Sequence, residues 1–168
     1  MAGTTLHKSA RLSMIVCLGP AAAGLPGWAQ PADWAETTIG NIQQTFAAVG
    51  YECEAVTARE GEEPAFVAAG EGKVRRLIGL RAGGTVIHCI AWFTIREDAK
   101  ARALEAINRA NEATYIGKYY VDGDGDLAVE YALLVGERFS PGEVQALDRR
   151  FDEELAGVLV EQLQDMLQ

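Results

Sequence analysis

The sequence contains little of what metal, phosphate and nucleic-acid sites require. It has two histidines, three cysteines, and 24 acidic against 15 basic residues, which gives a formal net charge of −9. Nucleic-acid binding needs clustered lysine and arginine side chains to neutralise phosphates, and an electrostatic hold on anionic lipid has the same requirement. The acidic balance therefore argues against both partners. A hydrophobic content of 49% is enough to bury a core, so the chain is expected to fold.

Motifs for catalysis or cofactor binding are also missing. The glycines at 70, 72, 83 and 84 lack the lysine and the serine or threonine of a phosphate-binding loop. A serine or cysteine nucleophile needs a histidine base within reach, and His88 lies in an apolar run where a packed histidine is the ordinary case. We therefore expect no cofactor, no metal and no enzymatic activity. The alternative is a hydrolase-like enzyme, or a small-ligand or cation binder, with an unrecognised site.

The first 29 residues differ in kind from the rest. Lys8 and Arg11 precede an apolar run that ends in Gly27-Trp28-Ala29, and the segment contains no acidic residue. This order is typical of a secretory signal peptide cleaved after Ala29. A retained membrane anchor, the alternative, needs about 20 apolar residues, and proline and glycine interrupt this run.

Cleavage would leave a periplasmic or secreted domain of residues 30–168 with no membrane contact. Loss of Lys8 and Arg11 reduces 15 basic residues to 13 against 24 acidic ones, a net charge of −11. Cys53 and Cys89 would remain. In an oxidising compartment two cysteines can form a disulfide, but two free thiols in separate strands fit the sequence equally well. The sequence leaves that choice open.

Hydrophobic periodicity predicts an α+β domain with the order helix, four strands, helix, two strands, helix. Asp33 and Glu36 stand where a capping box would start the first helix, which Gly50 would end. Ser140 is expected to cap a last helix of about 27 residues. Groups of adjacent strands separated by helices indicate a mainly antiparallel sheet with helices packed on it. Strands are expected at residues 51–58, 64–69, 74–82, 86–95, 118–121 and 127–135.

Asp122, Asp124 and Asp126 alternate with glycines between two of these strands. An EF-hand calcium loop that started at Asp122 would need a glycine at its sixth position and an acidic residue at its twelfth, where Leu127 and Leu133 stand. Asp-Gly pairs flanked by strand residues are instead typical of a hairpin turn. We interpret the stretch as structural.

One face of the strand from Val86 to Ile95 has no obvious cover. It carries His88, Ile90 and Trp92, and a two-layer domain has no element left to pack on it. The end of the last helix also has more apolar residues than a single stripe requires. We expect a partner surface for another protein, or for a second copy of the chain, with Trp92 as its anchor. The residues of this expected surface are His88, Ile90, Trp92, Leu163, Met166 and Leu167.

The region from residue 104 to 155 resembles the YbjN-domain family. Five features follow one another in that family's order. They are Asn108 and Asn111 near a helix end, a basic-aromatic strand, the aspartate-rich hairpin, an apolar-acidic strand and a long last helix. The resemblance extends over residues 34–165 and implies a fold similar to type III secretion chaperones, often dimeric. The family is described as regulatory, and the resemblance implies no catalytic residues. The sequence differs from many members of the family because it carries a predicted signal peptide. We expect an exported, non-catalytic binding or chaperone-like regulatory module of the cell envelope that acts through protein–protein contacts.

Overall fold

The computed structural model describes residues 33–57 and 62–168. The predicted signal peptide and its cleavage site, residues 1–29, lie outside the described residues. Those that are described belong to one unit, Pro31–Gln168. None of the helices in this part of the chain is both long enough and apolar enough to cross a bilayer.

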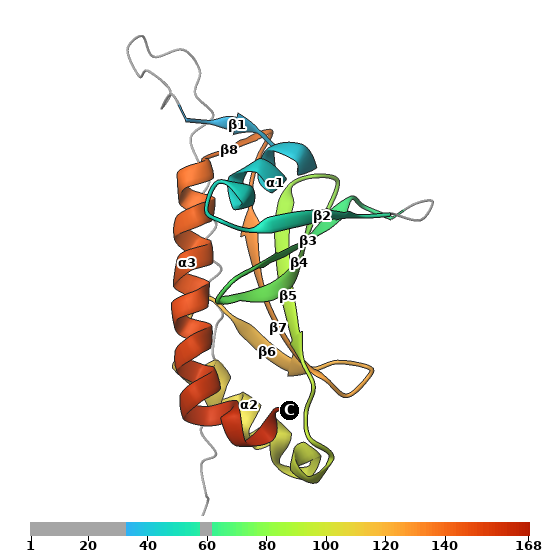
Figure 1. The fold of residues 1–168 in the computed structure, drawn as a ribbon, viewed down its shortest axis with the longest axis vertical. Coiled ribbons are helices and arrows are strands. Elements are labelled where there is room, and N and C mark those ends of the chain that lie inside the picture. Colours follow the sequence, from blue (N-terminus) through green and yellow to red (C-terminus); the bar gives the residue numbers. More distant parts are fainter. Residues whose placement is uncertain (1–32, 58–61) are drawn as a thin grey trace, which may run out of the picture. The chain divides into compact units, whose positions relative to one another are not determined.

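A six-stranded antiparallel sheet forms the centre of this unit (Figure 1). Every strand alternates its side chains between the two faces, and long apolar runs occupy two neighbouring interior strands, β5 and β7. The predicted α+β class and the antiparallel sheet are confirmed. In spatial order the strands are β2 (Glu52–Val56), β3 (Ala65–Gly70), β4 (Lys73–Arg81), β5 (Val86–Phe93), β7 (Leu127–Leu134) and β6 (Lys118–Val121).

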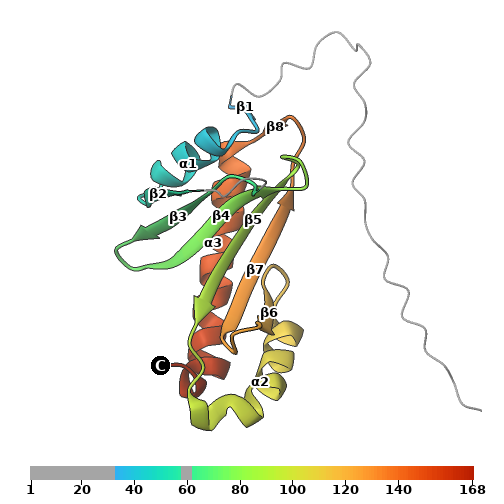
Figure 2. The same cartoon turned by 90° about the vertical axis from the view of Figure 1, so that its right-hand side faces the viewer.

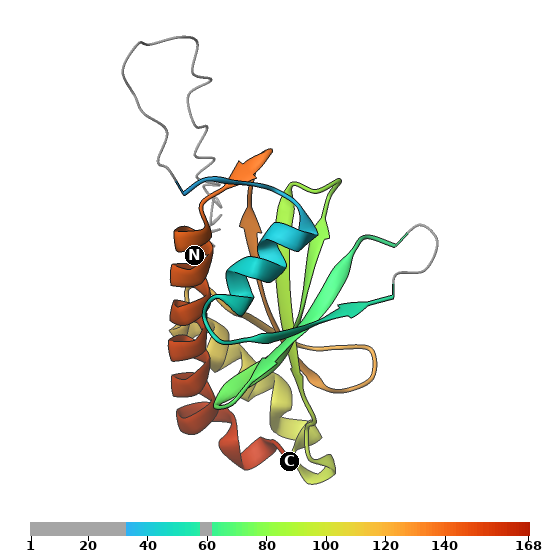
Figure 3. The same cartoon turned by 45° about the horizontal axis from the view of Figure 1, so that its top comes forward.

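Helices cover one face of this sheet and bury the core against it. They are α1 (Ile39–Ala47), α2 (Lys100–Ala113) and α3 (Pro141–Val158), with a short 3₁₀ turn, η1 (Glu97–Ala99), before α2. Helix α1 lies beside α3 (Figure 3). One apolar cluster joins side chains from all three helices to the inward-facing residues of the strands. In Figure 2, which is turned by 90° from Figure 1, the sheet lies in front of α3.

The first helix starts later than the sequence pattern predicts. Thr38 is its N-cap, and the Thr38 Oγ1 atom accepts a hydrogen bond from the backbone of Asn41 at 3.2 Å. The predicted capping box at Asp33 and Glu36 is wrong, because β1 (Ala35–Glu36) pairs instead with β8 (Arg138–Phe139) in a separate two-stranded ribbon. A pairing between residues about a hundred positions apart has no local sequence signal.

The last helix is shorter than predicted. Helix α3 ends at Val158, a π-helical turn η2 (Leu159–Leu163) follows, and a 3₁₀ turn η3 (Gln164–Met166) ends the helical region. The chain end then lies along the segment after β5, where Arg96 N donates to the Met166 carbonyl at 2.8 Å and Gln168 N to that of Thr94 at 3.1 Å. The π and 3₁₀ turns thus replace the final α-helical turns that the sequence predicts, and these tertiary bonds hold the chain end.

The aspartate stretch is a hairpin turn, as predicted. The Asp122 Oδ1 atom accepts hydrogen bonds from the backbone nitrogens of Asp124 and Asp126, both at 3.0 Å. Asp122 N donates to the Asp126 carbonyl at 2.9 Å, and Gly125 adopts a φ of +88°, which favours glycine. The first aspartate thus organises the loop by bonding its own backbone.

Candidate functional site

The sheet face opposite the helices is the candidate site, and we call it the open face. Strand β5 presents Val86, His88, Ile90 and Trp92 on it, and the neighbouring strands add the residues in register with these four. No helix of the described residues covers this face, which is turned toward the viewer in Figure 2. Within the part of the chain that the structure describes, this face is left uncovered.

The centre of the open face is apolar. Val67, Leu77 and Ile90 are neighbours there, because Leu77 pairs with both of the others across β3, β4 and β5. Beside them Trp92 leaves 45% of its surface exposed. Trp92, Val67, Leu77 and the basic residue Arg75 line a hollow of about 200 Å³. An exposed indole at the rim of an apolar hollow is a suitable anchor for a side chain of a partner.

A polar group lies on the same face toward β6. The carboxylate of Glu130 accepts hydrogen bonds from Lys118 Nζ and the Tyr120 hydroxyl at 3.0 Å, and His88 Nε2 lies 3.1 Å from it. Partial burial raises the pKa of Glu130, but the hydrogen bonds from Lys118, His88 and Tyr120 outweigh burial and hold the pKa below its ordinary value. Glu130 is therefore ionised at neutral pH and does not have the raised pKa of a general acid.

The helix-covered face contains a buried ionic cluster that sequence reasoning missed. Arg76 on β4 binds Asp148 on α3, with Nη1 2.7 Å from Oδ1, and its other terminal nitrogen binds Asp152. The hydroxyls of Tyr51 and Tyr131 donate to Asp148 at 2.9 and 3.1 Å. Burial raises the pKa of Asp148 above its ordinary value, although Arg76 and the tyrosine hydroxyls act in the opposite direction.

A sequence signal for this cluster existed. Asp148 follows Val144 by four positions and thus falls on the predicted apolar stripe of the last helix, where an acidic residue needs a partner. Arg76 and Asp148 side chains have almost no contact with solvent. Because the cluster is covered by α3, its chemistry is structural: it attaches the helix to the sheet.

The structure brings together only half of the six residues predicted for the partner surface. His88, Ile90 and Trp92 do share the open face, although Ile90 is 7% exposed. Leu163 and Met166 are 0% and 3% exposed, so their assignment to a surface is wrong. The turns η2 and η3 rotate both side chains into the core, where Leu167 is partly buried against them.

Cys53 and Cys89 are free thiols in the structure. They lie on β2 and β5, which are separated by β3 and β4. Three strand spacings of about 4.8 Å exceed the Cα separation of about 7 Å that a disulfide tolerates. The pairing that the sequence left open is therefore not made. Burial raises the pKa of Cys89 to about 12, although Arg76 and Tyr131 act to lower it.

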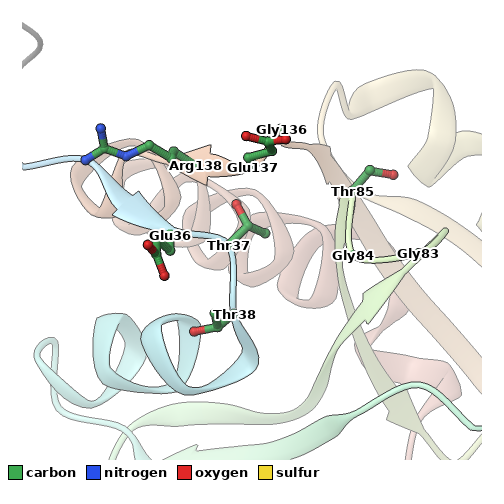
Figure 4. Close-up of a pocket in the computed structure, with 9 residues that line it drawn as sticks. All are labelled: Glu36, Thr37, Thr38, Gly83, Gly84, Thr85, Gly136, Glu137 and Arg138. Atoms are coloured by element: carbon green, nitrogen blue, oxygen red, sulfur yellow. The ribbon is translucent and has the colours of Figure 1, made fainter.

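A second hollow, of about 480 Å³, lies between the β1–β8 ribbon and the turn that joins β4 to β5 (Figure 4). Glycine backbone and threonine side chains form much of its wall, and it contains none of the residues predicted for a site. The residues that line this hollow are Glu36, Thr37, Thr38, Gly83, Gly84, Thr85, Gly136, Glu137 and Arg138.

Within residues 33–57 and 62–168, no group of three or more histidine, cysteine or acidic side chains is arranged to hold a metal ion.

Comparisons with known proteins agree with this fold. Residues 38–159 match the model of the YbjN family, described as "Putative bacterial sensory transduction regulator". The chain is also similar to the crystal structure of "YbjN, a putative transcription regulator from E. coli", with a TM-score of 0.61 and 17% identity, over 78% of this chain and 96% of that one. At this identity the likeness shows the fold alone. No curated protein sequence matches the chain.

Proposed function

The chain belongs to the YbjN family, and we propose that it is an exported, non-catalytic regulatory module of the cell envelope that binds a polypeptide partner through the open face. The observation that carries this proposal is Trp92, 45% exposed beside an apolar hollow on a sheet face that no described helix covers. Burial of such a ring in a partner's pocket is a common source of binding energy. Leu134, 76% exposed on the same face, adds apolar area.

The state of the carboxylates supports a binding role over a catalytic one. A carboxyl group that acts as a general acid at neutral pH needs a raised pKa. The neighbour of His88 is Glu130, whose pKa is lowered by its donors. The carboxyl group with a raised pKa is Asp148, which lies under α3 on the other face of the sheet.

The binding role is tested by site-specific photo-crosslinking in cells. A photoreactive phenylalanine analogue replaces Trp92 in one variant and Leu104 in the control, because Leu104 is 66% exposed but lies on α2 in the helix layer. We expect one defined protein adduct from position 92 and none of that mass from position 104. Equal adducts from both positions would contradict the proposal. An adduct of twice the chain's mass would identify a second copy as the partner.

Export is tested separately by the mass of the intact protein in the periplasmic fraction. The proposal rests on the basic residues, the apolar run and the small residues that precede Gln30. We expect a new N-terminus at Gln30 or its cyclised form. Recovery of the uncleaved chain from the cytoplasm alone would remove the envelope from the proposal and leave the open face as a site for an intracellular partner.

A further inference from the structure

The two edges of the sheet differ in whether they can accept another strand. Strand β6 forms one edge and β2 the other. At the β6 edge the side chain of Asn111 forms hydrogen bonds with the two backbone groups of Tyr119 that point away from the sheet. Its Nδ2 donates to the Tyr119 carbonyl at 2.9 Å, and its Oδ1 accepts from Tyr119 N at 2.9 Å. Because β6 has only four residues, this pair of bonds closes the middle of the edge.

The β2 edge is only partly closed. Alternate residues of an edge strand direct both backbone groups away from the sheet. Gln43 Nε2 donates to the Cys53 carbonyl at 3.1 Å from the side away from β3, so Cys53 faces outward and Ala55, two residues later, does as well. The described residues make no hydrogen bond to the N–H or C=O group of Ala55, which is exposed. This part of β2 retains a donor and an acceptor for another chain.

The side chains of β2 define what such a chain would contain. Glu52, Glu54 and Val56 are exposed and alternate along the strand, so all three project on the open face. Val56 also borders a hollow of about 230 Å³ that Ala65 and Leu77 help to line. In an antiparallel pair, side chains directly opposite each other are about 4.5–5.5 Å apart, close enough for ion pairs.

We propose that the β2 edge binds an extended, basic polypeptide segment by strand addition. In the antiparallel orientation the segment carries an apolar side chain opposite Val56 and lysine or arginine opposite Glu54 and Glu52, each separated by one residue. A second copy of the chain does not supply this pattern, because Gln43 already bonds the Cys53 carbonyl, and antiparallel pairing centred on Ala55 sets Glu54 opposite Val56 rather than opposite a basic residue. The contact goes beyond the open-face proposal, since β3 and β4 separate β2 from the strand of Trp92.

The test measures binding of a labelled peptide to the purified protein by fluorescence anisotropy. The peptide has one valine and two lysines at alternate positions, with threonines between them. Its control is an isomer of the same composition with adjacent lysines. Two cross-strand ion pairs and one apolar pair predict about tenfold tighter binding of the alternating peptide. Equal binding of the isomer would mean that only general attraction between the basic peptide and the acidic protein holds the peptide. That result would overturn the proposal.

Variants of the edge complete the test. Ala55→Pro removes the outward N–H group and leaves the bonds to β3 in place, so it should weaken binding about tenfold. Ala55→Val, the matched control, keeps that group and should bind like the wild type. Glu52→Lys with Glu54→Lys should transfer the preference to a peptide with glutamates in place of lysines. Unchanged binding by folded Ala55→Pro would overturn strand addition. Trp92→Ala should bind the peptide normally, so the open-face proposal stands or fails separately.

Discussion

Arg76 and Asp148 form an ion pair between β4 and α3, with 2.7 Å between Nη1 and Oδ1 and side-chain exposures of 0% and 4%. The pair lies between the sheet and the helix layer, and the hydroxyls of the core residues Tyr51 and Tyr131 also donate to Asp148. Asp152, one helical turn later, binds the second nitrogen of the same guanidinium. Apolar packing alone would permit α3 to slide along the sheet, whereas these bonds are directional and define one position.

Arg76→Leu should be strongly destabilising. The variant leaves Asp148 buried without its positive partner, and loss of one member of a buried ion pair costs about 3–5 kcal/mol of unfolding free energy. Urea denaturation at pH 7 measures the change. Arg76→Leu combined with Asp148→Leu should recover part of the loss, because the buried carboxylate of Asp148 is then absent and that of Asp152, 28% exposed, keeps contact with solvent.

The matched control is Arg150→Leu. Arg150 binds Glu153 on the outer side of α3 at 3.3 Å, with both side chains mostly exposed. Exposed pairs contribute about 0–1 kcal/mol, so this variant should remain close to the wild type. If Arg76→Leu were no more destabilising than Arg150→Leu, the buried pair would not stabilise the position of α3.

The sequence predicted the fold where local periodicity and tertiary structure agree. The alternation in Val86–Phe93 predicted β5, and the Asp-Gly stretch predicted the hairpin that joins β6 to β7, because these signals lie within a few residues. The misses share one physical cause. The β1–β8 ribbon, the turns after Val158 and the Arg76–Asp148 pair all depend on residues far apart in the chain. Periodicity places Asp148 on a buried stripe, but it does not say which distant residue is the partner.

Asp122 and Asp124 should respond differently to alanine. The Asp122 carboxylate accepts two backbone hydrogen bonds within the hairpin, and each is worth about 0.5–1.5 kcal/mol. Asp122→Ala should therefore lower the unfolding free energy by about 1–2 kcal/mol. Asp124 is exposed, so Asp124→Ala should change it by less than about 0.5 kcal/mol. Equal effects in urea denaturation would contradict the assignment of Asp122 as the residue that organises the turn.

Calcium should leave the stability of the protein unchanged. The hairpin lacks the acidic residue at the twelfth position of an EF-hand loop, and the Asp122 Oδ1 atom is already bonded to backbone. A ligand at a hundredfold excess over its Kd would add about 2.7 kcal/mol. Thermal unfolding with and without millimolar calcium measures this. A rise of several degrees that disappears in Asp124→Ala would make the loop a cation site.

The two described thiols should differ in reactivity. Cys89 is fully buried, and burial raises its pKa to about 12. Cys53 is only partly buried on the edge strand. Iodoacetamide at pH 8 should therefore alkylate Cys53 in the native protein and Cys89 only in urea. Peptide mapping by mass spectrometry locates the adducts. A peptide that links Cys53 to Cys89 would show that the thiols pair and that the strands between them have moved.

The last prediction concerns acid stability and Glu130. Burial raises its pKa, but donors from Lys118, His88 and Tyr120 hold it below the ordinary value of 4.5. A carboxylate whose folded-state pKa is lowered stabilises the fold above its unfolded pKa, and this contribution is lost as the pH falls through the folded pKa. Glu130→Gln cannot titrate, so its unfolding free energy should fall less than that of the wild type between pH 7 and acidic pH.

Urea denaturation across a pH series that extends below 4.5 measures this difference. Lys118→Met supplies the matched variant, because it removes the donor that lies 3.0 Å from Glu130 Oε1 and leaves the carboxylate able to titrate. Its pH profile should lie between those of the wild type and Glu130→Gln, since His88 and Tyr120 still lower the pKa of Glu130. Parallel profiles for the wild type and Glu130→Gln would mean that the open-face donors do not hold an ionised carboxylate in the folded protein.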